Sequence, residues 1–184
     1  MTILSPKALL VSTLLLLSPI ATLAATPSTA PKVGDMAVSF NAGFDFALDD
    51  DFEGGELVFT GTFEYYTTPR VSWRGLLGTT SFEGDFPGNP SLDFTFFNAN
   101  YVYNWERGKF HPFLTGGIGL YQKDGSSSLP SEFDESVFGL NGGGGVDWFL
   151  GPRWGLKFEG TLHVLTGENP NTILLGTGGV MFWF

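Results

Sequence analysis

From residue 36 to its last residue, the sequence repeats segments of roughly ten residues in which apolar and polar side chains alternate. Alternation with a period of two is typical of β-strands that have one apolar and one polar face. Stretches rich in glycine, proline, asparagine and aspartate separate the segments. The pattern predicts eight strands, at residues 36–46, 56–66, 71–82, 92–105, 110–122, 136–150, 154–166 and 172–184.

The fourth segment changes its pattern part of the way along. Phe97 and Tyr101 continue the apolar face of its second half, whereas Leu92, Phe94 and Phe96 fall on the opposite parity. A β-bulge adds one residue to a strand and so exchanges its two faces. We therefore expect a bulge near Phe96 and Phe97.

The connections between the predicted strands alternate in length. Residues 67–70, 106–109 and 151–153 form short connections, 47–55, 83–91 and 123–135 form long ones, and 167–171 is intermediate. An even number of strands, with short turns on one side and longer loops on the other, is typical of a membrane-spanning barrel. The predicted fold is all-β: an eight-stranded antiparallel up-and-down transmembrane β-barrel over residues 36–184.

The charged residues of the predicted strands lie on the polar face, near the short connections. They are Glu64, Arg74, Asp147, Lys157 and Glu159. A soluble barrel would turn this face outward, whereas a barrel in lipid turns its apolar face outward. Charges inside a narrow eight-stranded lumen must be paired, because an unpaired buried charge is very costly. We expect these residues to form one lumen charge network in the half of the barrel next to the short connections, which is the periplasmic half in membrane barrels. The network would act either as a structural plug or as a gate in a narrow conduction pathway.

Large aromatic residues of the apolar face gather near the same short connections. Tryptophan prefers the membrane–water interface, where its ring lies in the apolar edge and its N–H remains hydrated. The predicted interfacial aromatic girdle, on the periplasmic side, consists of Tyr65, Trp73, Trp105, Trp148, Trp154 and Phe184.

The N-terminal region has the features of a secretory signal peptide. Lys7 precedes an apolar run over residues 8–17, and small residues follow up to Ala25. The run is too short for a spanning helix, which needs about 20 residues. We expect residues 1–25 to be the signal peptide and residues 26–35, with Pro27 and Pro31, to be a flexible periplasmic lead-in.

The chain is acidic, and most of its acidic side chains fall in the long predicted loops. The formal net charge of −10 becomes −11 when Lys7 leaves with the signal peptide. An acidic chain without a basic stripe argues against a nucleic-acid partner, and the absence of cysteine excludes disulfide and thiol chemistry. Lys123 is the one basic residue among the acidic residues of the long predicted loops. These acidic residues either keep the exposed loops solvated or bind divalent cations or a cationic partner. They are Asp49, Asp50, Asp51, Glu53, Glu83, Asp85, Asp124, Glu132, Asp134, Glu135 and Glu168.

Two stretches and the C-terminus carry a family resemblance. Residues 98–105 read NANYVYNW and residues 108–119 read GKFHPFLTGGIG, a pattern that resembles the small outer-membrane β-barrel family of the OmpA/OmpX-like type. The alternating last strand, which ends on Phe184, resembles the insertion signal of such barrels. The resemblance implies a place in the outer membrane of a Gram-negative bacterium, with both termini in the periplasm. It also implies contact with outer-membrane lipids and lipopolysaccharide, and recognition of Phe184 by the barrel assembly machinery.

Members of this family act as anchors, in adhesion, as narrow pores and occasionally as lipid-modifying enzymes. A lipid A deacylase of this type would show a His-x-Ser pair, but His163 is followed by Val164 and Leu165. His111 lies near the opposite, periplasmic end, so a palmitoyltransferase-like His/Asp/Ser set is not formed. We expect no catalytic residue, metal site or cofactor.

The expected function is a non-enzymatic one. The barrel would serve as a scaffold whose extracellular loops meet the environment or an unidentified partner. The alternatives are a narrow pore for small solutes or ions, and a lipid-modifying enzyme that uses His163.

Overall fold

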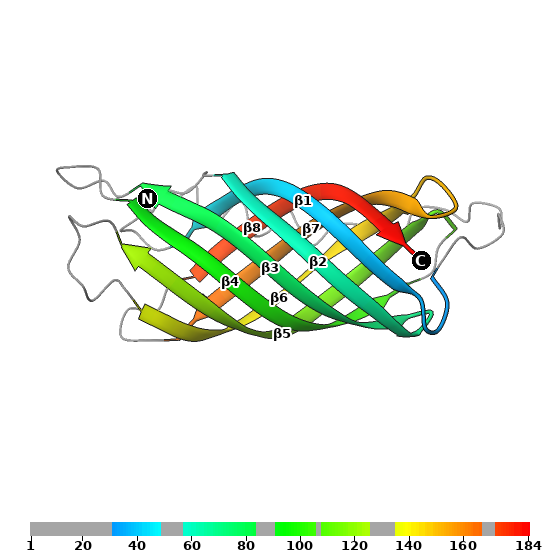
Figure 1. Cartoon of the computed structure of the whole chain (residues 1–184), viewed down its shortest axis with the longest axis horizontal. Helices are drawn as coiled ribbons and strands as arrows, with labels where there is room; N and C mark the ends of the chain where they lie inside the picture. The colour runs from blue at the N-terminus through cyan, green and yellow to red at the C-terminus, as the bar shows by residue number, and fades with distance from the viewer. Residues whose placement is uncertain (1–30, 49–56, 84–90, 106–107, 126–134, 167–171) are drawn as a thin grey trace, which may run out of the picture.

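The structure is a closed barrel of eight antiparallel strands (Figure 1). The computed structural model describes residues 31–48, 57–83, 91–105, 108–125, 135–166 and 172–184. No helix within these residues is long and apolar enough to cross a membrane. The predicted fold is confirmed, and the strand ends differ from the predicted ones by at most three residues. The strands are β1 (Met36–Ala47), β2 (Leu57–Thr68), β3 (Val71–Glu83), β4 (Ser91–Asn104), β5 (Phe110–Gly125), β6 (Glu135–Phe149), β7 (Trp154–Leu165) and β8 (Thr172–Trp183).

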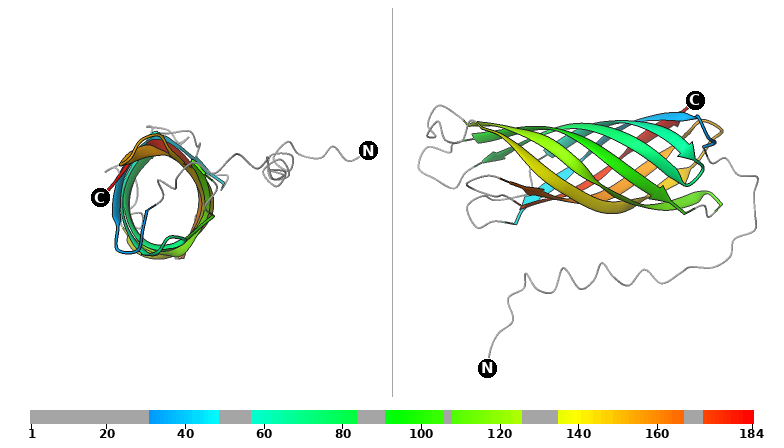
Figure 2. Two further views of the ribbon diagram at one scale, coloured as in Figure 1. Left: turned by 90° about the vertical axis from the view of Figure 1, so that its right-hand side faces the viewer. Right: turned by 90° about the horizontal axis from the view of Figure 1, so that it is seen from below.

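The first and last strands close the barrel. β1 pairs with β8 from Ala37 opposite Trp183 to Ala47 opposite Ile173. The ladder continues to the last residue, because Met36 and Phe184 each donate a backbone N–H to the other's carbonyl oxygen at 2.9 Å. Seen along its axis, the sheet forms a complete ring (Figure 2). Closure satisfies the backbone groups that an edge strand would leave unpaired, which is what a lipid environment requires.

The two ends of the barrel differ. The turn end, at the right of Figure 1, holds the start of β1, the C-terminus and residues 69–70, 105, 108–109 and 150–153 of the connections. Pro31 to Asp35 form a turn against this end, where Gly34 donates its N–H to the carbonyl of Tyr66 at 2.8 Å. Gly34 and Gly108 have positive φ angles, 91° and 64°, which suit glycine in tight turns. The opposite end is called the loop end.

Several predicted features lie outside the described residues. These are the signal peptide at residues 1–25, residues 26–30 of the lead-in, and the acidic residues Asp49, Asp50, Asp51, Glu53, Asp85, Glu132, Asp134 and Glu168.

The barrel wall has its apolar side chains outside and its polar side chains inside. Phe40 on β1 is 71% exposed and Phe138 on β6 is 65% exposed, whereas Glu64 and Lys157 are each 1% exposed in the lumen. A wall of this kind would be unstable in water, since it exposes large apolar side chains and buries charges. The arrangement fits lipid as the outer solvent, as the alternation predicted.

The bulge predicted in β4 is wrong. β4 keeps one continuous register with β3 from Ser91 to Tyr103 and with β5 from Leu92 to Asn104. Phe94 and Phe96 point into the lumen and are 1% and 3% exposed. The same face of β4 points into the lumen along the whole strand. The side chains that line the lumen change from polar to apolar toward the loop end. The described register shift instead lies between Tyr66 and Thr68 of β2.

Inward-facing glycines allow neighbouring strands to approach closely. A Cβ atom added to Gly43 would lie 1.9 Å from the carbonyl oxygen of Gly176, and one added to Gly143 would lie 2.1 Å from that of Gly160. No side chain fits at such a distance, so these positions need glycine for space rather than for flexibility. Glycine at these positions lets the backbones of neighbouring strands lie close together while their pairing continues.

Candidate functional site

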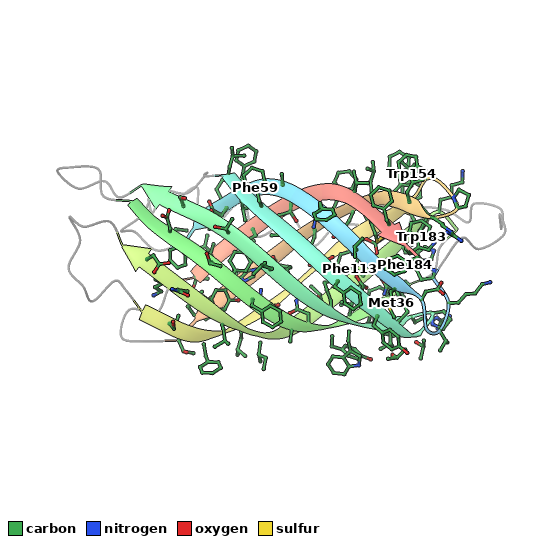
Figure 3. All side chains as sticks on the ribbon, in the orientation of Figure 1. Met36, Phe59, Phe113, Trp154, Trp183 and Phe184 are labelled. Carbon is green, nitrogen blue, oxygen red and sulfur yellow. The ribbon has the colours of Figure 1, made fainter. Side chains whose placement is uncertain are left out.

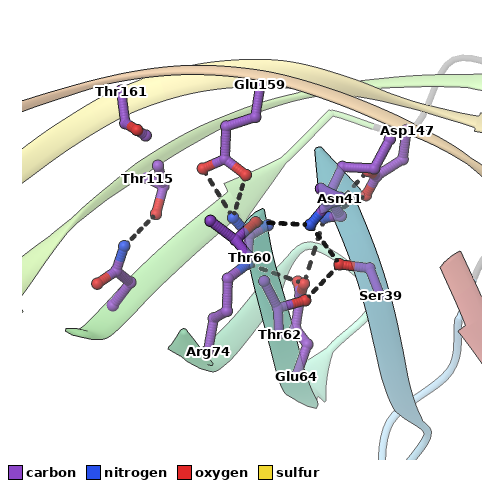
Figure 4. A network of polar contacts seen from close by, with 12 residues as sticks. Ser39, Asn41, Thr60, Thr62, Glu64, Arg74, Thr115, Asp147, Glu159 and Thr161 are labelled. Atoms are coloured by element: carbon purple, nitrogen blue, oxygen red, sulfur yellow. Dashed lines mark hydrogen bonds and ion pairs between the residues drawn. The ribbon is translucent and has the colours of Figure 1, made fainter. Parts of the chain in front are cut away.

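The five predicted lumen charges meet in one buried cluster, the charge network of Glu64, Arg74, Asp147, Lys157 and Glu159 (Figure 4). Glu64 and Arg74 are direct cross-strand partners on β2 and β3, as are Asp147 and Lys157 on β6 and β7. Within these pairs, Arg74 Nε lies 3.1 Å from Glu64 Oε2, and Lys157 Nζ lies 3.1 Å from Asp147 Oδ1. Sequence alternation brings each of these pairs together on one wall.

Two further ion pairs cross the lumen. Arg74 Nη1 on β3 lies 2.9 Å from both carboxylate oxygens of Glu159 on β7. Lys157 Nζ on β7 lies 3.4 Å from Glu64 Oε2 on β2. Ser72 donates a hydrogen bond of 2.5 Å to the other oxygen of Glu64. The network therefore fixes opposite walls to each other, which neither cross-strand pair could do alone.

Phe113 is a member of this layer that the sequence reasoning did not single out. Its ring centroid lies 4.9 Å from Arg74 Cζ and 4.6 Å from Lys157 Nζ, and the side chain is 2% exposed. Both cations can interact with the ring, and its carbon atoms fill the space between them. The sequence could have indicated Phe113 as a lumen residue, because it falls on the inward-facing parity of β5 in a segment otherwise rich in glycine.

Hydroxyl and amide side chains form the next layer toward the loop end. On β1 and β2, Ser39 and Thr62 share a hydrogen bond of 2.6 Å, and Asn41 Nδ2 donates to Thr60 Oγ1 at 3.1 Å. On the other wall, Asn100 Nδ2 donates to Asn141 Oδ1 at 2.8 Å and to Thr115 Oγ1 at 3.2 Å. These contacts join hydroxyl and amide groups of different strands inside the barrel.

Beyond this polar layer, the lumen is filled by an apolar cluster that the sequence reasoning missed. Phe96 and Tyr121 stack with ring centroids 5.9 Å apart, and His163 packs edge-on against both rings. The signal was present in Phe94 and Phe96, but it was interpreted as a bulge. The cluster, here named the loop-half plug, consists of Val58, Leu76, Phe94, Phe96, Tyr121, Val137, Leu165, Ile173 and Leu175.

A second apolar cluster closes the lumen at the turn end. Phe149 lies between two rings, with its centroid 4.5 Å from that of His111 and 4.7 Å from that of Trp183. Trp183 falls on the inward parity and is 6% exposed. The cluster, here named the turn-end plug, consists of Ala37, Tyr66, Phe149, Met181 and Trp183. The charged and polar layers are thus enclosed between two apolar layers.

The predicted girdle residues lie on the outer wall at the turn end. Figure 3 shows Trp154 and Phe184 there, with Phe59 on the wall farther toward the loop end. Trp148 is half-buried because Phe110 stacks on it at 5.3 Å. Trp73 packs edge-on against Tyr101 at 5.6 Å. The other girdle residues are exposed: Tyr65, Trp73, Trp105, Trp154 and Phe184.

The two histidines are placed as structural side chains. His163 Nδ1 lies 2.7 Å from the hydroxyl of Tyr121, and its Nε2 lies 3.1 Å from Thr161 Oγ1. The His163 side chain is 2% exposed and lies inside the lumen. His111 Nε2 lies 3.2 Å from the carbonyl oxygen of Gly108 at the turn end. The described residues contain no group of three or more His, Cys, Asp or Glu arranged to hold a metal ion.

Known structures share this architecture. Neisserial surface protein A matches with a TM-score of 0.63 and 15% identity over 82% of this chain and 99% of that one. OprG from Pseudomonas aeruginosa matches with a TM-score of 0.59 and 14% identity over 85% and 98%. Ail of Yersinia pestis, solved with the heparin analogue sucrose octasulfate, matches with a TM-score of 0.53 and 13% identity over 81% and 99%. At these identities, the likeness concerns the fold.

Comparison at the level of sequence families gives a direct assignment. No curated protein matches the chain. The model of the outer membrane protein beta-barrel domain matches residues 10–179, most of the chain. The chain therefore belongs to the family of outer membrane protein beta-barrel domains.

Proposed function

We propose that this protein is a non-enzymatic and non-conducting scaffold of the outer membrane, whose loop end faces the environment. The observation that carries this proposal is the filled lumen. An ion moving along the axis would have to pass the turn-end plug, the charge network and the loop-half plug in turn. Apolar constrictions exclude water, and the ion pairs that cross the lumen leave Arg74 and Lys157 bound on both sides.

The proposed orientation puts both termini in the periplasm. Support comes from the short connections and the girdle at the turn end, which resemble the periplasmic side of membrane barrels. The long connections, with nearly all the loop acids, would then lie outside the cell.

The charge of the loops narrows the class of extracellular partner. Ail was solved with a polyanion, whereas the long connections of this chain and the strand ends beside them carry many carboxylates and one lysine, Lys123, which is buried in β5. Like charges repel, so a cationic surface or divalent cations suit these loops better than a sulfated polymer does. Binding of folded barrel to immobilised polylysine and to immobilised heparin would test this inference. We expect salt-sensitive retention on polylysine; retention on heparin through the loop end would contradict the inference.

The main competing function is a narrow pore. Purified barrel in planar bilayers is expected to show no conductance steps, with folding verified beforehand by heat-modifiable migration of unboiled samples. Regular steps that change in Lys157→Met would support a pore gated by the charge network and would overturn the non-conducting proposal.

The third possibility is a lipid-modifying enzyme that uses His163. The hydrogen bonds of His163 to Tyr121 and Thr161, together with its burial, support a packing role instead. Lipid A from cells that overproduce the protein is expected to have an unchanged mass spectrum. A new lipid A species that disappears in His163→Asn would refute this view.

A further inference from the structure

Exposed positive charge within the described residues is confined to one end of the barrel. The exposed lysines and arginines are Lys32, Arg70, Lys109 and Arg153, all at the turn end. The remaining described cations, Arg74, Lys123 and Lys157, are buried. At the loop end, Asp93 and Asp124 are exposed and are direct cross-strand partners on β4 and β5. The barrel is therefore strongly polarised along its axis.

The turn-end cations lie beside the interfacial aromatic girdle. Arg153 directly precedes Trp154, and Lys109 directly precedes Phe110, whose ring stacks on Trp148. Arg70 occupies the connection that leads into β3 and its exposed Trp73. Interfacial aromatic side chains lie at the level of the lipid headgroups. Their neighbours Arg70, Lys109 and Arg153 are consequently held at that same level.

We propose that Arg70, Lys109 and Arg153, together with the adjoining aromatic rings, form a binding surface for anionic phospholipid headgroups. Lys32 shares its turn with Asp35, which accepts a hydrogen bond from the Lys32 backbone N–H at 2.7 Å. Among the described residues, the excess positive charge at this end therefore rests on the other three side chains. Arginine and lysine bind phosphate oxygens through charge-assisted hydrogen bonds, and the rings contact the upper acyl chains. The proposal does not depend on whether the lumen conducts.

A lipid headgroup fits this surface better than a soluble partner does, because of where the cations lie. Each of the three belongs to a separate connection, so together they follow the rim of the barrel rather than one compact patch. A rim is what surrounding lipid contacts, and lipid molecules can bind at each connection independently. A cation near an anionic membrane surface strengthens binding by about fivefold.

The chain carries a built-in reporter for this test. All five tryptophans lie in the turn-end half, four on the outer wall and Trp183 inside. Their fluorescence therefore reports the lipid composition at this end only. The barrel would be folded into phosphatidylcholine vesicles that contain equal fractions of either dibromo-phosphatidylglycerol or dibromo-phosphatidylcholine. We expect stronger quenching by the brominated phosphatidylglycerol, and a preference that declines as salt is added.

The test variant is Arg70→Gln/Lys109→Gln/Arg153→Gln, in which the two brominated lipids should quench equally. A control adds Asp93→Asn and Asp124→Asn to this variant, which restores most of the net charge at the far end. The preference should stay lost in the control, because the binding surface is local. Recovery of the preference in the control, or equal quenching in the unmodified protein, would overturn the proposal.

Each variant would first be checked for heat-modifiable migration. If the triple variant does not fold, Lys109→Gln alone supplies the measurement. Its preference for phosphatidylglycerol should fall by about fivefold at most, and an unchanged preference would count against the proposal.

Discussion

At the scale of single residues, the charge network depends on the pairing of each cation with two carboxylates. Arg74 is bound to Glu64 on one side and to Glu159 across the lumen. Removing one partner of a buried ion pair leaves an uncompensated charge and costs about 3–5 kcal/mol. We expect Arg74→Met to lower the free energy of unfolding by this amount, measured by urea titration of the barrel in lipid vesicles. The variant Arg74→Met/Glu64→Gln/Glu159→Gln should recover most of the loss. A loss below about 1 kcal/mol in Arg74→Met would show that the network is not effectively buried.

Gly142 and Gly143, adjacent residues of β6, allow a controlled test of the close approach between neighbouring strands. A Cβ on Gly143 would lie 2.1 Å from the carbonyl oxygen of Gly160, whereas a Cβ on outward-facing Gly142 meets its nearest atom, the carbonyl oxygen of Thr115, at 3.8 Å. We expect Gly143→Ala to reduce the folded fraction strongly. Gly142→Ala should be neutral or slightly stabilising, because alanine restricts the unfolded chain. Heat-modifiable gel migration measures both, and equal behaviour of the two variants would disprove the close approach.

At the scale of one strand, β4 can be tested directly for regularity. The chain has no cysteine, so single cysteines at residues 94 to 99 can carry nitroxide labels without background. Oxygen dissolves in lipid, and collisions with it should be frequent for Phe97→Cys and rare for Phe96→Cys. A regular strand gives strict alternation over these positions, while a bulge would give two successive positions with the same accessibility.

The same strand shows why sequence reasoning predicted the wall well and the lumen less well. The outer face meets one uniform solvent over most of the strand, so the outward residues from Phe97 to Trp105 are apolar or aromatic, and alternation reveals them. The lumen is layered, so inward residues change from Asn98 and Asn100 to Phe94 and Phe96 within one strand. If each face of a strand is assumed to keep one polarity along its length, the change from asparagine to phenylalanine is interpreted as a bulge. Contacts across the lumen, such as Arg74 with Glu159, depend on barrel diameter and stagger, which alternation does not specify.

At the scale of the whole molecule, the proposed orientation predicts which end can be labelled from outside the cell. Asp124→Cys at the loop end should react with a membrane-impermeant maleimide on intact cells. Arg153→Cys at the turn end should react only after the outer membrane is permeabilised. Both positions are exposed, so a difference reports the side of the membrane. Labelling of Arg153→Cys on intact cells would reverse the orientation.

The closure between β1 and β8 sets an order of events during biogenesis. Phe184 and Met36 exchange both backbone hydrogen bonds, and the residues between Ala37 and Ala47 occupy the rest of the β8 edge. A factor that recognised β8 by strand pairing on that edge would use the same donors and acceptors as β1. Recognition of the C-terminal strand and completion of the ring would then be mutually exclusive. The N-terminal strand of the barrel, although synthesised first, would be its final piece, and its arrival would itself displace the factor.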